Sequence, residues 1–153
     1  MKRSLFGRGT MMLAVGVFAL GLLMGLVGTS AAGTSFSSYG YYTTAGNNYK
    51  NRSYIYTDHD NNHSAHASTA SIYRDGGNIG AGWMGALPRR FNGNGVLLCT
   101  GVWYYNGGPA SSITVNGCYI NSHAGFGSDG QTRAWHGSGY YTYGAFSTLI
   151  MYS

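Results

Sequence analysis

The residues whose types could bind a metal or catalyse a reaction are concentrated between positions 58 and 66. Asp58, His59, Asp60, His63 and His66 are side chains of the kinds that coordinate zinc, and the last two have His-x-x-His spacing. That spacing forms a metal pair on a helix, but the intervening Asn and Ser residues favour a turn and a strand. Because residues three apart on a strand point to opposite faces, we predict a surface turn and no metal site.

Other patterns that resemble catalytic motifs lack the structural context that their chemistry needs. Gly125 to Gly130 fits a dinucleotide-binding spacing, but no helix pattern follows it. Ser138 lies between two glycines without the strand and helix that make a nucleophile elbow. The chain has four Asp and no Glu, so a pair of placed carboxylates for glycoside hydrolysis has few candidates. We therefore predict no catalytic residues and no cofactor.

The aromatic residues favour a binding surface instead. The chain has 14 Tyr and 3 Trp, and all of them lie after position 32. Adjacent tyrosines on a strand point to opposite faces, so each Tyr-Tyr pair should leave one ring towards solvent or a partner. The predicted binding residues are Tyr41, Tyr42, Trp83, Trp103, Tyr104, Trp135 and Tyr140. Outward rings could equally stabilise cross-strand pairs, and the sequence leaves this alternative open.

Two strands that carry the only cysteines should organise the elements that position these rings. The stretch from Val96 to Ile120 is rich in β-branched and aromatic residues on both sides of Asn106-Gly-Gly-Pro, which favours a hairpin. Cys99 and Cys118 lie one on each side of this turn. A disulfide between them would remove loop-closure entropy of about 3 kcal/mol from the unfolded chain.

Alternation rather than helical periodicity marks the rest of the chain after the N-terminal segment. From 64 to 73, for example, even-numbered and odd-numbered residues would line opposite faces of a strand. We expect an all-β fold, a small antiparallel β-sandwich with one disulfide. The predicted organisation is a signal peptide at 1–32, an extended or flexible Tyr, Gly and Ser-rich arm at 33–51, and the β-sandwich domain at 52–153.

The signal-peptide prediction changes the charge balance. The N-terminal segment has the order of a secretory signal: basic residues, then an apolar run from Met11 to Val27, then small residues up to Ala32. Without it, six basic residues face four acidic ones, so the net charge of +5 becomes +2. We expect no nucleic-acid partner, no membrane insertion after signal cleavage, and a secreted, extracellular protein in which two cysteines form a disulfide.

Short motifs suggest a family. Tyr56, then His63-Ser-Ala, a glycine-rich gap, Ala81-Gly-Trp and Ala86 occur in an order that resembles lactococcin 972-type bacteriocins. The resemblance covers about a third of the chain after the signal peptide. It implies a compact antiparallel β-sandwich and antibacterial action at the cell envelope. The cysteines and the C-terminal strands lie outside these motifs.

Three functions are consistent with these observations. The first is a non-enzymatic binding protein in bacterial antagonism, acting alone or as a small subunit of an exported toxin assembly, with a co-secreted protein partner or a cell-envelope target. The second is a carbohydrate-binding or cell-wall-binding module in which Trp83, Trp103 or Trp135 stacks on sugar rings. The third is a secreted hydrolase that uses the residues between 58 and 66.

Overall fold

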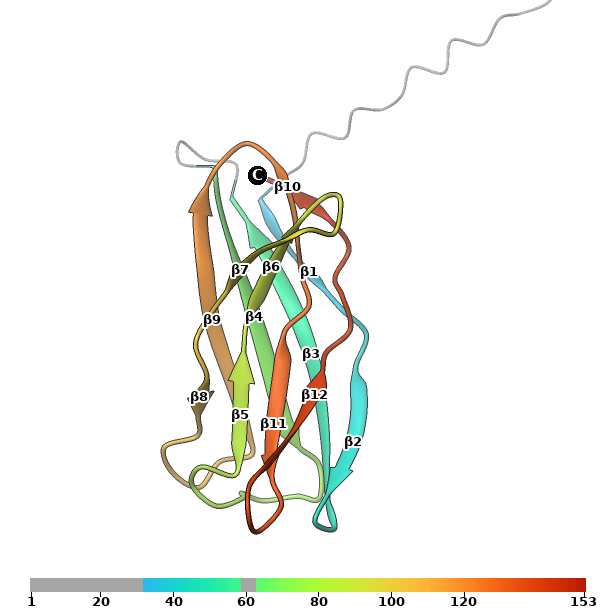
Figure 1. The fold of residues 1–153 in the computed structure, drawn as a ribbon, viewed down its shortest axis with the longest axis vertical. Helices are drawn as coiled ribbons and strands as arrows, with labels where there is room; N and C mark the ends of the chain where they lie inside the picture. Colours follow the sequence, from blue (N-terminus) through green and yellow to red (C-terminus); the bar gives the residue numbers. More distant parts are fainter. Residues whose placement is uncertain (1–31, 59–62) are drawn as a thin grey trace, which may run out of the picture.

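The computed structural model describes residues 32–58 and 63–153, and within them every regular element is a β-strand (Figure 1). All the strand pairs are antiparallel, and one disulfide joins Cys99 to Cys118, so the predicted fold class is confirmed. The predicted signal peptide lies, apart from Ala32, outside the described residues. In the described part of the chain, no helix has the length and apolar character needed to cross a membrane.

The first layer of the sandwich is a five-stranded sheet. Its strands are β1 (Gly33–Phe36), β2 (Gly40–Thr44), β3 (Asn47–Thr57), β4 (Ser64–Tyr73) and β9 (Ser112–Asn121). β1 and β2 pair with opposite halves of β3, so together they form one edge of the layer, and β9 forms the other edge.

Two sheets that follow each other along the long axis form the second layer (Figure 1). One has the order β12-β11-β5-β8 and the other β13-β10-β6-β7. Their strands are β5 (Met84–Leu87), β6 (Arg89–Asn92), β7 (Leu97–Thr100), β8 (Tyr104–Tyr105), β10 (Gly125–Ser128), β11 (Gln131–Trp135), β12 (Tyr140–Gly144) and β13 (Met151–Tyr152). A single residue, Pro88, lies between β5 and β6. Proline has no backbone N–H, so it interrupts the hydrogen bonds between neighbouring strands at this position.

Residues 33–51, predicted as an arm, are extended but belong to the sheet. Gly33 to Phe36 pair with Thr57 to Tyr54, and Gly40 to Thr44 pair with Asn51 to Asn47. The polar composition suggested a solvated segment, but alternate side chains point into the sandwich. Tyr49 and Asn51 are fully buried, and the Asn51 amide donates to Thr132 Oγ1 at 2.8 Å. The segment is therefore an edge of the β-sandwich rather than a free arm.

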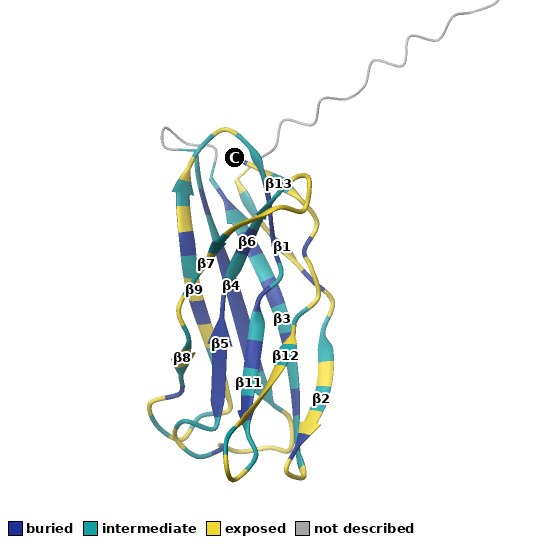
Figure 2. Ribbon diagram, in the orientation of Figure 1, coloured by how far each residue is buried: buried dark blue, intermediate teal, exposed yellow. Residues whose placement is uncertain are grey.

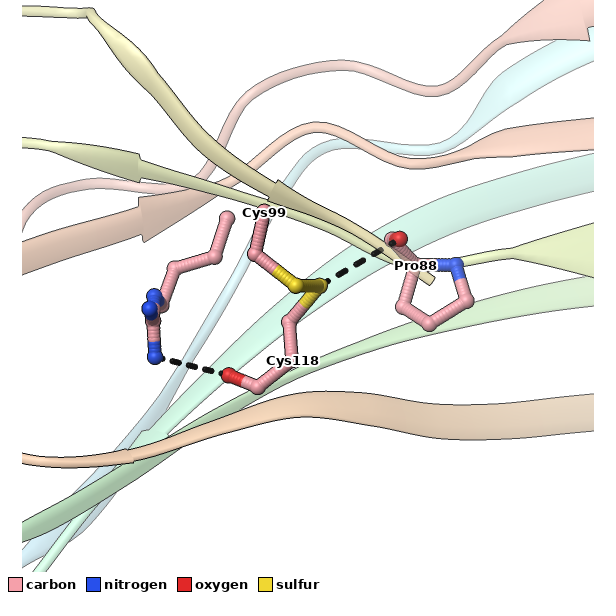
Figure 3. Close-up of a disulfide and its surroundings, with 4 residues drawn as sticks. Pro88, Cys99 and Cys118 are labelled. Atoms are coloured by element: carbon pink, nitrogen blue, oxygen red, sulfur yellow. Dashed lines mark hydrogen bonds between the residues drawn. A yellow bond between two sulfur atoms is a disulfide. The ribbon is translucent and has the colours of Figure 1, made fainter. Parts of the chain in front are cut away.

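The cysteines do not staple a hairpin. β7, which carries Cys99, pairs with β6, whereas β9, which carries Cys118, pairs with β4 in the other layer. The disulfide thus joins the edge strands of the two layers, with the Cα atoms 5.7 Å apart and Pro88 beside it (Figure 3). A bulge in β9 opposite Ala65 and Ala67, with Cys118 at φ 56°, directs this cysteine inward. The turn residues at 106–109 connect β8 to β9 across the sandwich.

A buried arginine lies next to this disulfide. Arg90 donates from Nη1 to the carbonyl oxygen of Cys118 at 2.8 Å, and its guanidinium lies 5.0 Å from the Phe126 ring centroid. Burial lowers the pKa of Arg90, since the charged form loses hydration. The charge is therefore held in the interior by a carbonyl dipole and an aromatic face.

Buried residues run along β4 and β5 in the interior of the sandwich (Figure 2). The interior has two apolar clusters with polar side chains between them. One cluster contains Ile55, Ala65, Ala67, Cys118 and Phe126, and the other contains Tyr49, Ile79, Met84 and Ala134. Between them, Gly130 N donates to Ser53 Oγ at 2.7 Å. A Cβ atom on Gly130 would lie 1.6 Å from Thr69 Oγ1 and 2.8 Å from the Leu87 carbonyl oxygen. The two layers can approach this closely only because residue 130 is glycine.

We expect Cys99→Ser to lower the free energy of unfolding by roughly 2–4 kcal/mol, because the bridge closes a loop between residues 19 apart in sequence. Urea denaturation followed by tryptophan fluorescence measures the change. Cys118→Ser and the double variant should give the same loss. An unchanged unfolding midpoint in all three would show that the cysteines are not paired.

We expect Gly130→Ala to lower the free energy of unfolding by about 3 kcal/mol, because the new methyl group would force the two layers apart. Thermal and urea denaturation both measure this. Gly144→Ala is the matched control, since a Cβ atom there meets nothing within 4 Å. Equal stability of the two variants would contradict the close approach.

Candidate aromatic binding surface

Aromatic side chains collect on the outer face of the β12-β11-β5-β8 sheet. Trp103 and Tyr105 have ring centroids 6.3 Å apart, Tyr105 and Tyr140 4.9 Å, and Tyr140 and Trp135 5.1 Å. The four rings therefore form a continuous chain across the sheet. With Arg133 between them, we refer to these five residues as the aromatic surface.

Strand alternation and register place these residues together. On β11, Thr132 and Ala134 are buried in the sandwich, so Arg133 and Trp135 point outward. Trp135 is paired with Tyr140 on β12, and Arg133 is paired with Gly85 on β5. Gly85 is in turn paired with Tyr105 on β8, and a Cβ atom at Gly85 would lie 2.8 Å from the Tyr105 ring. This glycine leaves the space that the Tyr105 ring occupies.

Arg133 is fixed at the centre of the surface by three contacts. Its guanidinium carbon lies 4.0 Å from the Trp103 ring centroid. Nη1 donates to the Tyr105 hydroxyl at 2.9 Å, and Nε donates to Thr142 Oγ1 at 3.2 Å. A planar cation stacked on indole and bonded at two points loses little further freedom on binding a ligand.

Tyr140 connects the surface to the loop that precedes β5. Its hydroxyl donates to the carbonyl oxygen of Gly82 at 2.7 Å, which requires the neutral phenol. Burial raises the pKa of Tyr140, the neighbouring Tyr105 raises it further, and Arg133 opposes both effects. The phenol therefore keeps its proton, and this hydrogen bond, through neutral pH.

A second run of rings continues from Trp135. The His136 ring centroid lies 6.4 Å from that of Trp135 and 4.3 Å from that of Tyr141, and both pairs are nearly parallel, at 21° and 23°. Tyr141 is 56% exposed. The rings of His136 and Tyr141 thus form a separate, partly exposed stack beside the turn between β11 and β12.

The structure brings together three of the seven predicted binding residues, Trp103, Trp135 and Tyr140. Trp83 lies beside them, since its carbonyl accepts from Trp135 N at 3.0 Å, but its side chain packs against the cluster around Tyr49 and Met84.

The other three predicted residues lie elsewhere. Tyr104 is 57% exposed and lines a hollow together with Tyr105 and residues 113–116 of β9. Tyr42 stacks between Tyr49 and Tyr143 in the interior. Tyr41 lies on the outer face of the first layer.

Sequence reasoning missed Tyr105 and Arg133. The signal that could have found them is strand alternation: Tyr105 lies two residues after Trp103, and Arg133 lies two residues before Trp135. An arginine at that spacing from a tryptophan on the same face of a strand indicates cation–π packing only once the register is known.

Of the residues between 58 and 66 that are of metal-binding type, His59 and Asp60 lie outside the described residues. His66 packs between Tyr56 and Tyr119 at 5.0 Å from each ring centroid. The His63 and His123 rings are 3.4 Å apart by their centroids. No group of three His, Cys, Asp or Glu side chains that could hold a metal ion occurs in the residues described by the structure.

Comparisons with known proteins found no matching family model, no matching curated protein and no matching solved structure. The similarity to lactococcin 972-type bacteriocins therefore stays a prediction from the sequence. Its motif residues lie on the first layer at Tyr56 and on β4, and in the second layer at Trp83 and Ala86.

We expect Gly85→Ala to displace the Tyr105 ring and to weaken its hydrogen bond with Arg133, at a cost of about 1–3 kcal/mol in stability. The Tyr105 ring resonances in an NMR spectrum, together with urea denaturation, measure both effects. Gly144→Ala, on the edge strand β12 of the same sheet, should change neither. Unshifted Tyr105 resonances in the Gly85 variant would contradict the packing described for this ring.

Proposed function

We propose that this protein is an exported, non-enzymatic binding protein and that the aromatic surface recognises a glycan of the cell envelope. The observation that carries the proposal is the chain of rings from Trp103 to Trp135 with Arg133 fixed at its centre. Glycan binding is the second of the three functions that are consistent with the sequence. Two of the three tryptophans predicted for it, Trp103 and Trp135, lie on the aromatic surface.

The chemistry of the surface is suited to sugars. The faces of Trp and Tyr rings carry partial negative charge, which attracts the weakly positive C–H groups on the face of a pyranose. Arg133, Thr142 and the Tyr105 hydroxyl supply donors and acceptors at the edge of the rings, and sugar hydroxyls need such partners. Rigid side chains on paired strands also lose little entropy on binding.

The biological setting that we propose is bacterial antagonism at the cell envelope, alone or within a larger exported assembly. Its support is the sequence resemblance to lactococcin 972-type bacteriocins and the order of basic, apolar and small residues at the N-terminus. In this setting the aromatic surface, by binding the glycan, would hold the protein at the envelope of the target cell.

The test is to titrate the protein with peptidoglycan fragments and a panel of envelope glycans. Tryptophan fluorescence and calorimetry measure the binding. We expect one glycan class to bind and Trp103→Ala and Trp135→Ala each to weaken it at least tenfold, which is about 1.4 kcal/mol. Arg133→Gln should weaken it too, because it removes donors without removing a ring.

Tyr104→Ala is the matched control, because Tyr104 is exposed on β8 and strand alternation points its side chain to the opposite face from that of Tyr105. It should bind the glycan as the unaltered protein does, and all variants should keep their melting temperature within a few degrees. A signal that stays flat across the whole panel would count against glycan binding. Growth inhibition of neighbouring bacteria by the unaltered protein, measured in parallel, tests the antagonism setting separately.

A further inference from the structure

The outer face of the first layer carries a cationic patch that the net charge of the chain conceals. Six basic residues lie in the described part of the chain. Arg89 is paired with Asp129, Arg90 is buried, and Arg133 belongs to the aromatic surface. The remaining three, Lys50, Arg52 and Arg74, all lie on this face.

Strand pairing sets the spacing of the three cations. Lys50 and Arg52 are two residues apart on β3, with buried Tyr49, Asn51 and Ser53 alternating between and beside them, so both point outward. Residues two apart on a strand are separated by roughly 7 Å. Arg74 follows β4, where its backbone N donates to Asn48 O at 2.8 Å, so it continues the row beyond Lys50.

Aromatic rings hold each of these cations. The Arg52 guanidinium lies 4.7 Å from the Phe36 ring centroid, 4.6 Å from Tyr39 and 4.8 Å from Tyr54, and its Nε donates to the Tyr54 hydroxyl at 2.9 Å. Lys50 Nζ lies 4.2 Å from the Tyr39 centroid, and Arg74 lies 4.8 Å from that of Tyr41. The rings therefore position the charges while leaving them at the surface.

Among the described residues, no carboxylate forms an ion pair with this row. The single ion pair among residues 32–58 and 63–153 is that of Arg89 with Asp129. Asp75, next to Arg74, accepts instead from the backbone N and the side-chain amide of Asn48, at 2.7 and 2.8 Å. These bonds, with a smaller effect of Arg74, hold the pKa of Asp75 below its usual range.

We propose that this cationic patch, formed by Lys50, Arg52 and Arg74 on their aromatic supports, binds a linear acidic polysaccharide. A chain with anionic groups spaced at roughly 7 Å would match the spacing of the row. Charge complementarity supplies the attraction, and the fixed guanidinium of Arg52 can form paired hydrogen bonds with a carboxylate or sulfate. The site lies on the opposite layer from the aromatic surface and does not use it.

The orientation of the rings favours a polysaccharide over a single-stranded nucleic acid. Successive bases need parallel ring platforms to stack on. Here Phe36 and Tyr54 are inclined by 72°, Tyr39 and Tyr41 by 49°, and each of the four rings already contacts a cation of the protein. The ligand is therefore recognised through its charges.

The test measures binding of the full-length protein to heparin, used as the acidic polysaccharide probe, over a range of salt concentrations. Neutral dextran and a single-stranded DNA oligonucleotide of equal charge are the comparison ligands. We expect heparin to bind more tightly than either. The Lys50→Gln, Arg52→Gln, Arg74→Gln triple variant should lose at least tenfold in affinity, with a shallower salt dependence.

Arg52→Gln and Arg89→Gln form a charge-matched pair, since each removes one positive charge but only Arg52 lies in the patch. Arg52→Gln should weaken heparin binding at least threefold and Arg89→Gln should leave it unchanged, with melting temperatures reported for both. Equal losses of heparin affinity in the two variants would show that net charge causes the binding, and would overturn the proposed site. The proposal is also overturned if the triple variant binds heparin as before, if the unaltered protein does not bind heparin at low salt, or if DNA binds more tightly.

Discussion

The close approach of the two layers at Gly130 is the constraint on which the rest of the sandwich depends. A side chain at this position would overlap Thr69, so here the backbone of the second layer contacts polar side chains of the first layer. At this level the bonds between layers are polar: Gly130 N to Ser53, and Asn51 to Thr132. Such bonds fix the relative position of the layers more narrowly than apolar contacts, because each requires a particular distance and angle.

This close approach at Gly130 also explains why the second layer is divided into two sheets. Pro88 interrupts one strand, and Asp129 and Gly130 interrupt its neighbour at the same level. Each half then packs its own apolar cluster against the first layer. The half with β6, β7, β10 and β13 is bonded to β9 through the disulfide, whereas the half with β5, β8, β11 and β12 carries the aromatic surface. The covalent bond and the candidate site are thus separated by the polar contacts.

The sequence alone predicts the all-β class and the pairing of Cys99 with Cys118, because alternation and cysteine number are local or compositional signals. It does not predict that the cysteines join different layers, since turn residues at 106–109 suit a hairpin and a crossover alike. The strands at 33–51 were missed because buried Asn51 and Tyr49 look solvated until their partners are known. Trp103 and Trp135 were identified by type, but Tyr105 and Arg133 depend on register, which no short stretch specifies.

The position of the disulfide determines how the sandwich can open. One long edge, between β7 and β9, is closed by a covalent bond. The opposite edge is held by the stacked rings of Tyr42 and Tyr143, 4.0 Å apart, and by the bond between Thr44 and the Tyr143 hydroxyl. We therefore expect partial unfolding in an oxidising medium to begin at the Tyr143 edge, with the layers separating about the disulfide. Proteases would then reach strands β2 and β12 before they reach β9.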